Sequence, residues 1–307
     1  MKFNSEVTMR LAGRFSKIVA RKRDGSERVL SYGFDNLILD SGLDNAAVES
    51  VLQGCAVGNG TSQPEESQSS LDSLVAFQTT TGIGDSSSIF DEENDVYGGV
   101  NTREYTFSEG DAEGNLSEIG VGWSSSALFS RELIRDENGD PTTITVLADE
   151  ELVVTYQLFY LVDIDPVPWG PKEIAGETRS GFIQPGQLGG SHWSNAGVNR
   201  IQVSSSNTSF TASENEPGDP QDFLNGDNPS SRDQTSSSAG ERFIEINLAW
   251  DDSRANFASG VAGFQWRFSG FVSGNFQASM DPPIMKTSDD ELTMTFRVNF
   301  DRGVVPE

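Results

Sequence analysis

Two short stretches decide the fold: residues 149–156 read DEELVVTY, and residues 289–296 read DDELTMTF. They lie at an offset of 140 residues (289 − 149). Two further pairs of segments match at an offset of 141, namely 114–123 (GNLSEIGVGW) with 255–264 (ANFASGVAGF), and 103–107 with 244–248. A nearly constant offset over three pairs indicates an internal repeat. We therefore interpret the chain as a tandem duplication of one domain.

The repeated stretches belong to segments that have the composition of β-strands. β-Branched and aromatic residues alternate with polar ones in the segments 143–147, 152–160, 243–248 and 292–300. Turn-forming pairs such as Asp24-Gly25 and Asn138-Gly139 separate such strands. Residues 42–54 are the one fair helix candidate, with a turn and a loop as the alternative. We expect a mainly β protein of tandem duplicated β-sandwich-like domains, with long polar loops and little helix.

Three prolines near the middle of the chain indicate a domain boundary. They lie within residues 163–172, which read DIDPVPWGPK. We predict a first β domain over 1–162, a Pro-rich linker over 163–172 and a second, related β domain over 173–307. Residues 61–72 and 204–241 are polar and are predicted to be loops. The loop at 204–241 either serves binding or is a surface excursion with no role.

The composition argues against several classes of partner. The chain has 307 residues, with 47 acidic and 21 basic side chains and a formal net charge of −26. Binding to nucleic acid and docking on an anionic membrane both need a basic surface, so we expect neither. No apolar run approaches the ~18 residues of a membrane-spanning helix, so we expect no membrane insertion. The first residues also lack the apolar segment of a secretory signal.

Few residues are suited to catalysis or to metal binding. Cys55 and His192 are the only cysteine and histidine, too few for an internal disulfide or a structural zinc site. The acidic turn at 136–140 lacks the Gly and Glu that complete an EF-hand loop, although calcium at another acidic turn stays open. The Gly-x-Gly at 58–60 is not a complete phosphate-binding loop, and no nucleophile elbow accompanies His192. We predict no catalytic residue, no metal and no cofactor, and a protein that is not an enzyme.

Basic residues are concentrated at the beginning of the sequence. Residues 1–28 contain eight basic and three acidic side chains, which gives this segment a charge of +5 and the remainder −31 (−26 − 5). We interpret the segment as a basic N-terminal arm that docks on an acidic neighbour, including another copy of the chain. The alternative is a solvated hairpin with Asp24-Gly25 at its tip. The residues assigned to this assembly arm are Arg10, Arg14, Lys17, Arg21, Lys22 and Arg23.

Aromatic residues in loops are candidates for contact with a ligand or a receptor. Most tryptophans are expected in the core, but Trp169 and Trp193 lie in segments predicted to be loops. His192 is next to Trp193 and is interpreted as a loop or interface residue. We therefore assign Trp169, His192 and Trp193 to a ligand or receptor contact.

Several segments of the sequence resemble those of a group of tailed-bacteriophage virion proteins, which are described as tail or tail-fibre structural proteins. The segments that carry the resemblance are 32–43 (YGFDNLILDSGL), 55–61 (CAVGNGT), 103–123, 128–136 (LFSRELIRD), 139–156 and 281–296 (DPPIMKTSDDELTMTF). The resemblance covers nearly the full length of the chain, except for residues 204–241.

The resemblance implies a non-enzymatic structural component of the tail, tail tip or neck of a phage. Its location would be the virion, assembled in the cytoplasm of the host bacterium, and its partners would be other virion proteins and copies of itself. A trimer of a duplicated chain would present six similar domains and could adapt to a six-fold ring. The alternatives are a tail-fibre module that binds a host surface glycan or receptor, a capsid decoration protein and a depolymerase.

Overall fold

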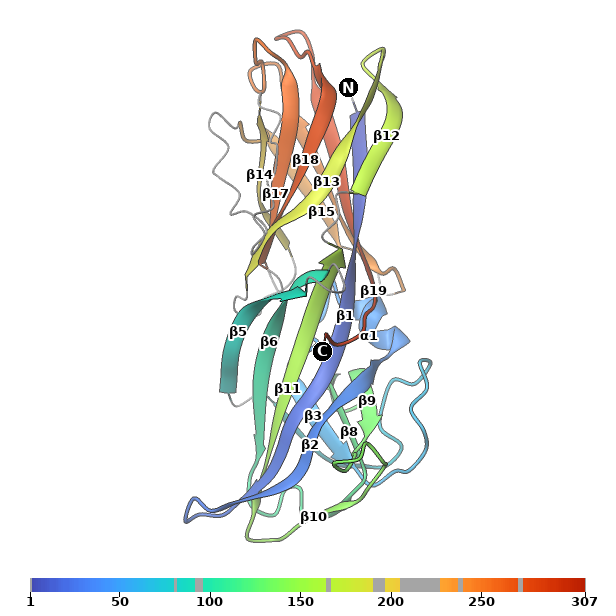
Figure 1. The fold of residues 1–307 in the computed structure, drawn as a ribbon, viewed down its shortest axis with the longest axis vertical. Coiled ribbons are helices and arrows are strands. Elements are labelled where there is room, and N and C mark those ends of the chain that lie inside the picture. Colours follow the sequence, from blue (N-terminus) through green and yellow to red (C-terminus); the bar gives the residue numbers. More distant parts are fainter. Residues whose placement is uncertain are drawn as a thin grey trace.

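The protein is built almost entirely of β-strands, as the alternating segments predict. The computed structural model describes residues 2–79, 82–91, 96–163, 167–189, 197–204, 227–236, 240–269 and 273–306. Over these ranges the chain forms one short helix and several β-sheets, the largest with 12 strands. Figure 1 shows an elongated molecule with two lobes, one above the other, joined at a waist.

The strands of the first half of the chain are mostly long. They are β1 (Lys2–Arg21), β2 (Glu27–Ile38), β3 (Gly54–Gly58), β4 (Leu74–Thr79), β5 (Gly82–Asp91), β6 (Val96–Phe107), β7 (Gly114–Leu116), β8 (Glu118–Ser124), β9 (Ala127–Leu133), β10 (Ile144–Val146) and β11 (Glu151–Asp163). The strands β2 to β11, with the second half of β1, form the lower lobe in Figure 1.

The strands of the second half form the upper lobe, together with the first half of β1. They are β12 (Val167–Ile174), β13 (Glu177–Gly189), β14 (Gly197–Ser204), β15 (Ser231–Ser236), β16 (Phe243–Trp250), β17 (Val261–Ser269), β18 (Ser273–Ile284) and β19 (Leu292–Arg302). One layer of this lobe has the order β15-β16-β19-β1, and the other is a five-stranded sheet with the order β12-β13-β18-β17-β14.

Strand β1 passes through both lobes. Its first half pairs in parallel with β19, from Lys2 opposite Thr293 to Leu11 opposite Arg302. Its second half, from Arg10 onward, pairs antiparallel with β11, and from Gly13 onward it also pairs with β2. Strands β11 and β19 therefore approach the waist from opposite directions, and both end near Arg10 (Figure 1).

The helix α1 (Asp40–Asn45) covers only the beginning of the predicted helix segment. It has six residues, and the chain then continues through turns to β3. Gly42 lies so close to the backbone of Phe129 that a Cβ atom would overlap the Phe129 carbonyl oxygen. This close approach lets Leu43, which is fully buried, pack into the core beside β9.

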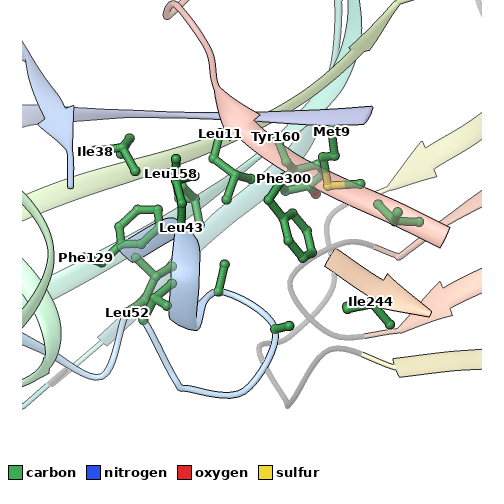
Figure 2. Close-up of a cluster of buried hydrophobic side chains, with 14 of the residues drawn as sticks. Met9, Leu11, Ile38, Leu43, Leu52, Phe129, Leu158, Tyr160, Ile244 and Phe300 are labelled. Atoms are coloured by element: carbon green, nitrogen blue, oxygen red, sulfur yellow. The ribbon is translucent and has the colours of Figure 1, made fainter. Parts of the chain in front are cut away.

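A single hydrophobic core continues from one lobe into the other. Figure 2 shows its side chains at the waist, where residues of α1, β1, β9 and β11 meet residues of β16 and β19. Leu11 lies centrally in this group and has no exposed surface. Phe129 of the lower lobe and Phe300 of the upper lobe belong to the same cluster.

The structure differs from the predicted domain boundaries in two places. Most of the predicted linker, 163–172, belongs to strand β12, which lies at the edge of its sheet. Pro168 and Pro171 fit an edge strand, because one side of such a strand has no neighbouring strand that needs their backbone N–H groups. The first half of β1 was predicted to lie in the first domain, yet it pairs with β19 of the second. Within the predicted loop 204–241, residues 205–226 and 237–239 lie outside the described part, while Ser231–Ser236 form β15.

Candidate assembly surfaces

The residues predicted to form a basic arm belong to strand β1 and to the turn that follows it. Each of the six cations faces a carboxylate of the same chain. The N–O distances are 2.5 Å for Arg10–Asp163, 3.6 Å for Arg14–Asp35, 3.4 Å for Lys17–Glu27, 3.0 Å for Arg21–Glu151, 3.1 Å for Lys22–Asp149 and 3.1 Å for Arg23–Glu109. The cations are thus part of a paired strand, and their role in docking on a neighbour stays a prediction.

A β-bulge explains why these cations all reach solvent. The register of β1 against β11 shifts between Phe15 and Lys17. A bulge adds one residue to a strand, so the inward and outward positions exchange there. Phe15 before the bulge and Ile18 after it are both buried, whereas Arg14 and Lys17 are both accessible.

A second charged group connects the lobes at the waist. One carboxylate oxygen of Asp40 in α1 forms ion pairs with Arg242 Nη2 at 2.5 Å and with Arg302 Nη2 at 2.7 Å. Arg242 also binds Asp44 at 2.7 Å, and Arg302 binds Glu66 at 3.0 Å. Hydrogen bonds from Arg302 and then Arg242 lower the pKa of Asp40 below its ordinary value. Carboxylates of the lower lobe thereby hold cations of the upper lobe.

A buried ion pair fixes the loop between β3 and β4. The side chains of Glu118 and Arg131 have no exposed surface and lie 2.8 Å apart. Glu118 also accepts hydrogen bonds from the backbone N–H groups of Gly60 and Ser73, both at 2.8 Å. Arg131 also binds Asp72 at 2.9 Å, through the same Nη2 atom that binds Glu118. The polar segment 61–72 is thus attached to the body of the lower lobe.

Two polar residues on β6 were not singled out from the sequence. Asn101 is fully buried, and neither atom of its amide has a hydrogen-bond partner within the described structure. Arg103 is 2% exposed, makes one hydrogen bond to the Thr102 carbonyl and has no ion pair among the described residues. Burial lowers the pKa of Arg103. The sequence does hold a signal for them. Asn101 and Arg103 lie four and two residues before the buried Tyr105, and this spacing places all three side chains on the apolar face of the strand.

A cavity of about 280 Å³ lies at the waist, beside residues 6–8 of β1. It is lined by Glu6, Val7, Thr8, Val162, Asp163, Val167, Ile183, Phe276 and Asn299. Its wall is mostly apolar, and its two ionisable groups, Glu6 and Asp163, are both acidic. The cavity therefore suits an apolar group that carries a positive charge.

The residues predicted to contact a ligand are only partly described. Trp169 is 6% exposed, and its Nε1 donates a hydrogen bond to the Ser279 carbonyl at 3.0 Å. Its ring is thus covered by the upper lobe and does not present a face to solvent. His192 and Trp193 lie outside the described residues, and their role stays a prediction.

Cys55 is fully buried, and burial raises the pKa of its thiol, which keeps it protonated. The described part of the chain contains no group of three or more His, Cys, Asp and Glu side chains that could hold a metal ion. Nor does it contain a helix long and apolar enough to cross a membrane.

The chain matches no family model, no curated protein and no solved structure.

Proposed function

We propose that the protein is a non-enzymatic structural component of a tailed-phage particle, in the tail, tail tip or neck, and that it acts by homo-oligomeric assembly. The sequence resemblance described above motivates the proposal. The structural observation that supports it most is strand β1, whose 20 residues pair with β19 in one lobe and with β11 in the other. A strand shared in this way couples both lobes into one elongated unit, which suits a part that transmits force between neighbours.

The strand pairings support a tandem duplication of sandwich-like domains. Strands β5-β6-β11 of the lower lobe are paired in the same order as β15-β16-β19 of the upper lobe. Likewise β2-β9-β8-β3 corresponds to β13-β18-β17-β14. Leu152 lies opposite Phe107, and the equivalent Leu292 lies opposite Trp250. The strand pairing thus makes residue 250 the equivalent of residue 107, whereas the sequence offset of 141 makes it residue 248. A shift of two residues leaves each side chain on the same face of the strand.

The duplication gives a trimer a geometric use. Three copies would contribute six similar lobes, which can match a six-fold ring of the tail. Because the lobes lie one above the other along the molecule, the long axis of each copy must lie across the tail axis to bring all six to one level (Figure 1). This arrangement makes the trimer hypothesis specific enough to test.

Locating the chain in the virion tests the proposal. A reconstruction of the particle should place its density in the tail or neck, as three copies around the axis with both lobes at the same level. Native mass measurement of the purified protein should find species of three 33.3-kDa chains. Isolated monomers at the site, or six copies in a ring, would overturn the trimer, and density on the capsid would overturn the tail location. An assembly that depends on the basic residues of β1 should weaken as salt rises from about 0.05 M to about 0.5 M.

A further inference from the structure

Among the described residues, the first residues of β1 are paired on one side only. Strand β19 pairs with residues 2–11, while the opposite edge carries β11, whose pairing begins at Arg10. No described strand pairs with the edge of residues 2–9 on that side. Lys172 of β12 reaches it and donates a hydrogen bond to the Asn4 carbonyl at 3.0 Å. The edge is therefore open to a further strand, with one lysine placed across it.

The position of Lys172 shows which backbone groups the edge offers. In a parallel ladder, the N–H and C=O groups of alternate residues face the same neighbour. Because the Asn4 carbonyl faces away from β19, the backbone groups of Lys2, Glu6 and Thr8 face the open edge as well. The side chains of these four residues are exposed. An added strand would thus pair at the even-numbered positions.

Within the part of the chain that the structure describes, the charges on this edge have no ion-pair partner. Every cation of β1 from Arg10 to Arg21 has a carboxylate within 4 Å. Lys2 and Glu6 are exposed, and neither makes an ion pair in the ranges that the structure describes. They lie four residues apart with Asn4 midway between them. A strand that is antiparallel to this one and has the same sequence would place a lysine opposite Glu6 and a glutamate opposite Lys2.

We propose that the edge formed by residues 2–9 pairs antiparallel with the same edge of a second copy, about a two-fold axis beside Asn4. Lys2 then lies opposite the Glu6 of the second copy, and the reverse pair forms on the other side of the axis. Opposite charges on directly paired residues stabilise an antiparallel ladder. The two β1–β19 layers become one continuous sheet across the contact, a form of strand addition.

The cavity at the waist fits this arrangement. It adjoins the edge at Glu6, Val7 and Thr8, and Asp163 lies on its rim. Glu6 and Asp163 supply negative charge beside the position of the incoming Lys2 ammonium group. Strand β11 pairs with β1 only from Arg10 onward, beyond the pairs that the incoming strand makes at Lys2, Asn4 and Glu6.

This contact rests on the homo-oligomeric part of the proposed function and names one interface between copies. A two-fold contact pairs identical surfaces, so it is distinct from the contacts around a trimer axis. It would join two trimers or two successive rings. Its test in solution needs no virion, so its failure and the failure of a tail location are separate results.

Single cysteines test the register. Asn4→Cys places two thiols opposite each other across the axis, with the Cα atoms near the ~5.5 Å that a disulfide needs. Thr8→Cys is the matched control, because it lies on the same edge but far from its own copy. We expect oxidation at high protein concentration to give a disulfide dimer with Asn4→Cys and monomer with Thr8→Cys. Equal yields from both variants, or no dimer from Asn4→Cys, would overturn the contact.

Charge exchange tests the ion pairs. Lys2→Glu and Glu6→Lys should each weaken dimerisation about tenfold in Kd, and the double variant should restore it. Glu113→Lys, which reverses the charge of an exposed residue before β7, should leave the Kd unchanged. Lys172→Ala removes the side chain that covers Asn4 and should strengthen the dimer. Sedimentation measures all five variants. A double variant as weak as the single ones, or a weaker dimer with Lys172→Ala, would show that this edge is not the interface.

Discussion

Ion pairs in this molecule differ most in how far their side chains are from water. The side chains of Arg131 and Glu118 have no exposed surface, and Glu118 also satisfies backbone groups of the 59–73 loop. Arg254 and Asp227 lie 3.5 Å apart with exposed fractions of 42% and 34%. A buried charge that loses its partner stays desolvated, whereas an exposed one is solvated by water. The two pairs should therefore respond very differently to the same substitution.

Arg131→Met should destabilise the protein by about 3–5 kcal/mol, because it leaves Glu118 buried without its cation. Arg254→Met, the matched control, should cost about 0–1 kcal/mol. Urea unfolding, monitored by tryptophan fluorescence, gives both free energies. Similar losses in the two variants would contradict the role of burial.

Asp40 should make stability depend on pH. Its pKa is lowered in the folded protein by Arg302 and Arg242, so its ion pairs stabilise the fold above the unfolded pKa of ~3.9. That contribution is lost as pH falls through the lower, folded pKa. Asp40→Asn should thus lower Tm at about pH 7, and this effect should shrink as pH falls through the folded pKa. Asp111→Asn, an exposed carboxylate with no described ion pair, should not change Tm over this range; a pH-independent loss for Asp40→Asn would contradict the ionic cause.

Asn101 differs from these ion pairs, because its side-chain amide is buried and has no hydrogen-bond partner in the described structure. Replacing it with Leu, whose side chain has the same number and branching of heavy atoms, removes an unsatisfied amide from the apolar face of β6. We expect Asn101→Leu to raise the free energy of unfolding by about 1 kcal/mol. Thr102→Leu, on the opposite face of the strand, is the control and should not stabilise. A loss of stability in Asn101→Leu would mean that the amide has a partner such as bound water.

At the scale of elements, local patterns were predictable from sequence and distant pairings were not. The alternating segments 152–160 and 292–300 are strands β11 and β19, since period-two alternation is a local property. Nothing local indicates that residues 2–11 pair with a strand near the other end of the sequence. The bulge after Phe15 also interrupts the alternation in β1. The sequence of this segment therefore indicates a basic arm. It identifies the cations but not the carboxylates with which they pair.

Removing residues 2–9 should affect one lobe and spare the other. The deletion opens the edge of β19 and removes the buried side chains of Val7 and Met9. Hydrogen exchange should then accelerate in β16 and β19, while β8 and β9 keep their protection. Thr8→Ala, which changes only an exposed side chain of the same strand, is the control. Uniform loss of protection in both lobes would contradict an effect confined to the upper lobe.

At the scale of the whole molecule, three features couple the lobes. Strand β1 belongs to both, the hydrophobic core is continuous across the waist, and Asp40 binds two arginines of the upper lobe (Figure 2). The internal repeat suggested two domains joined by a linker, each with a core of its own. The linker was predicted from the prolines of residues 163–172, but prolines are common on edge strands as well as in linkers. The coupling depends on contacts that no repeat or composition reveals.

The coupled lobes should unfold together. When two units share a strand and a core, neither reaches its unfolded state without exposing surface of the other, so intermediates are costly. Calorimetry of the intact chain should give one transition whose calorimetric and van't Hoff enthalpies agree. Deletion of residues 2–9 combined with Asp40→Asn should give two transitions, the lower one from the upper lobe. Asp111→Asn in the full-length chain should keep the single transition. Two transitions in the unmodified protein would show that the waist does not couple the lobes, and would favour independent domains on a flexible connection.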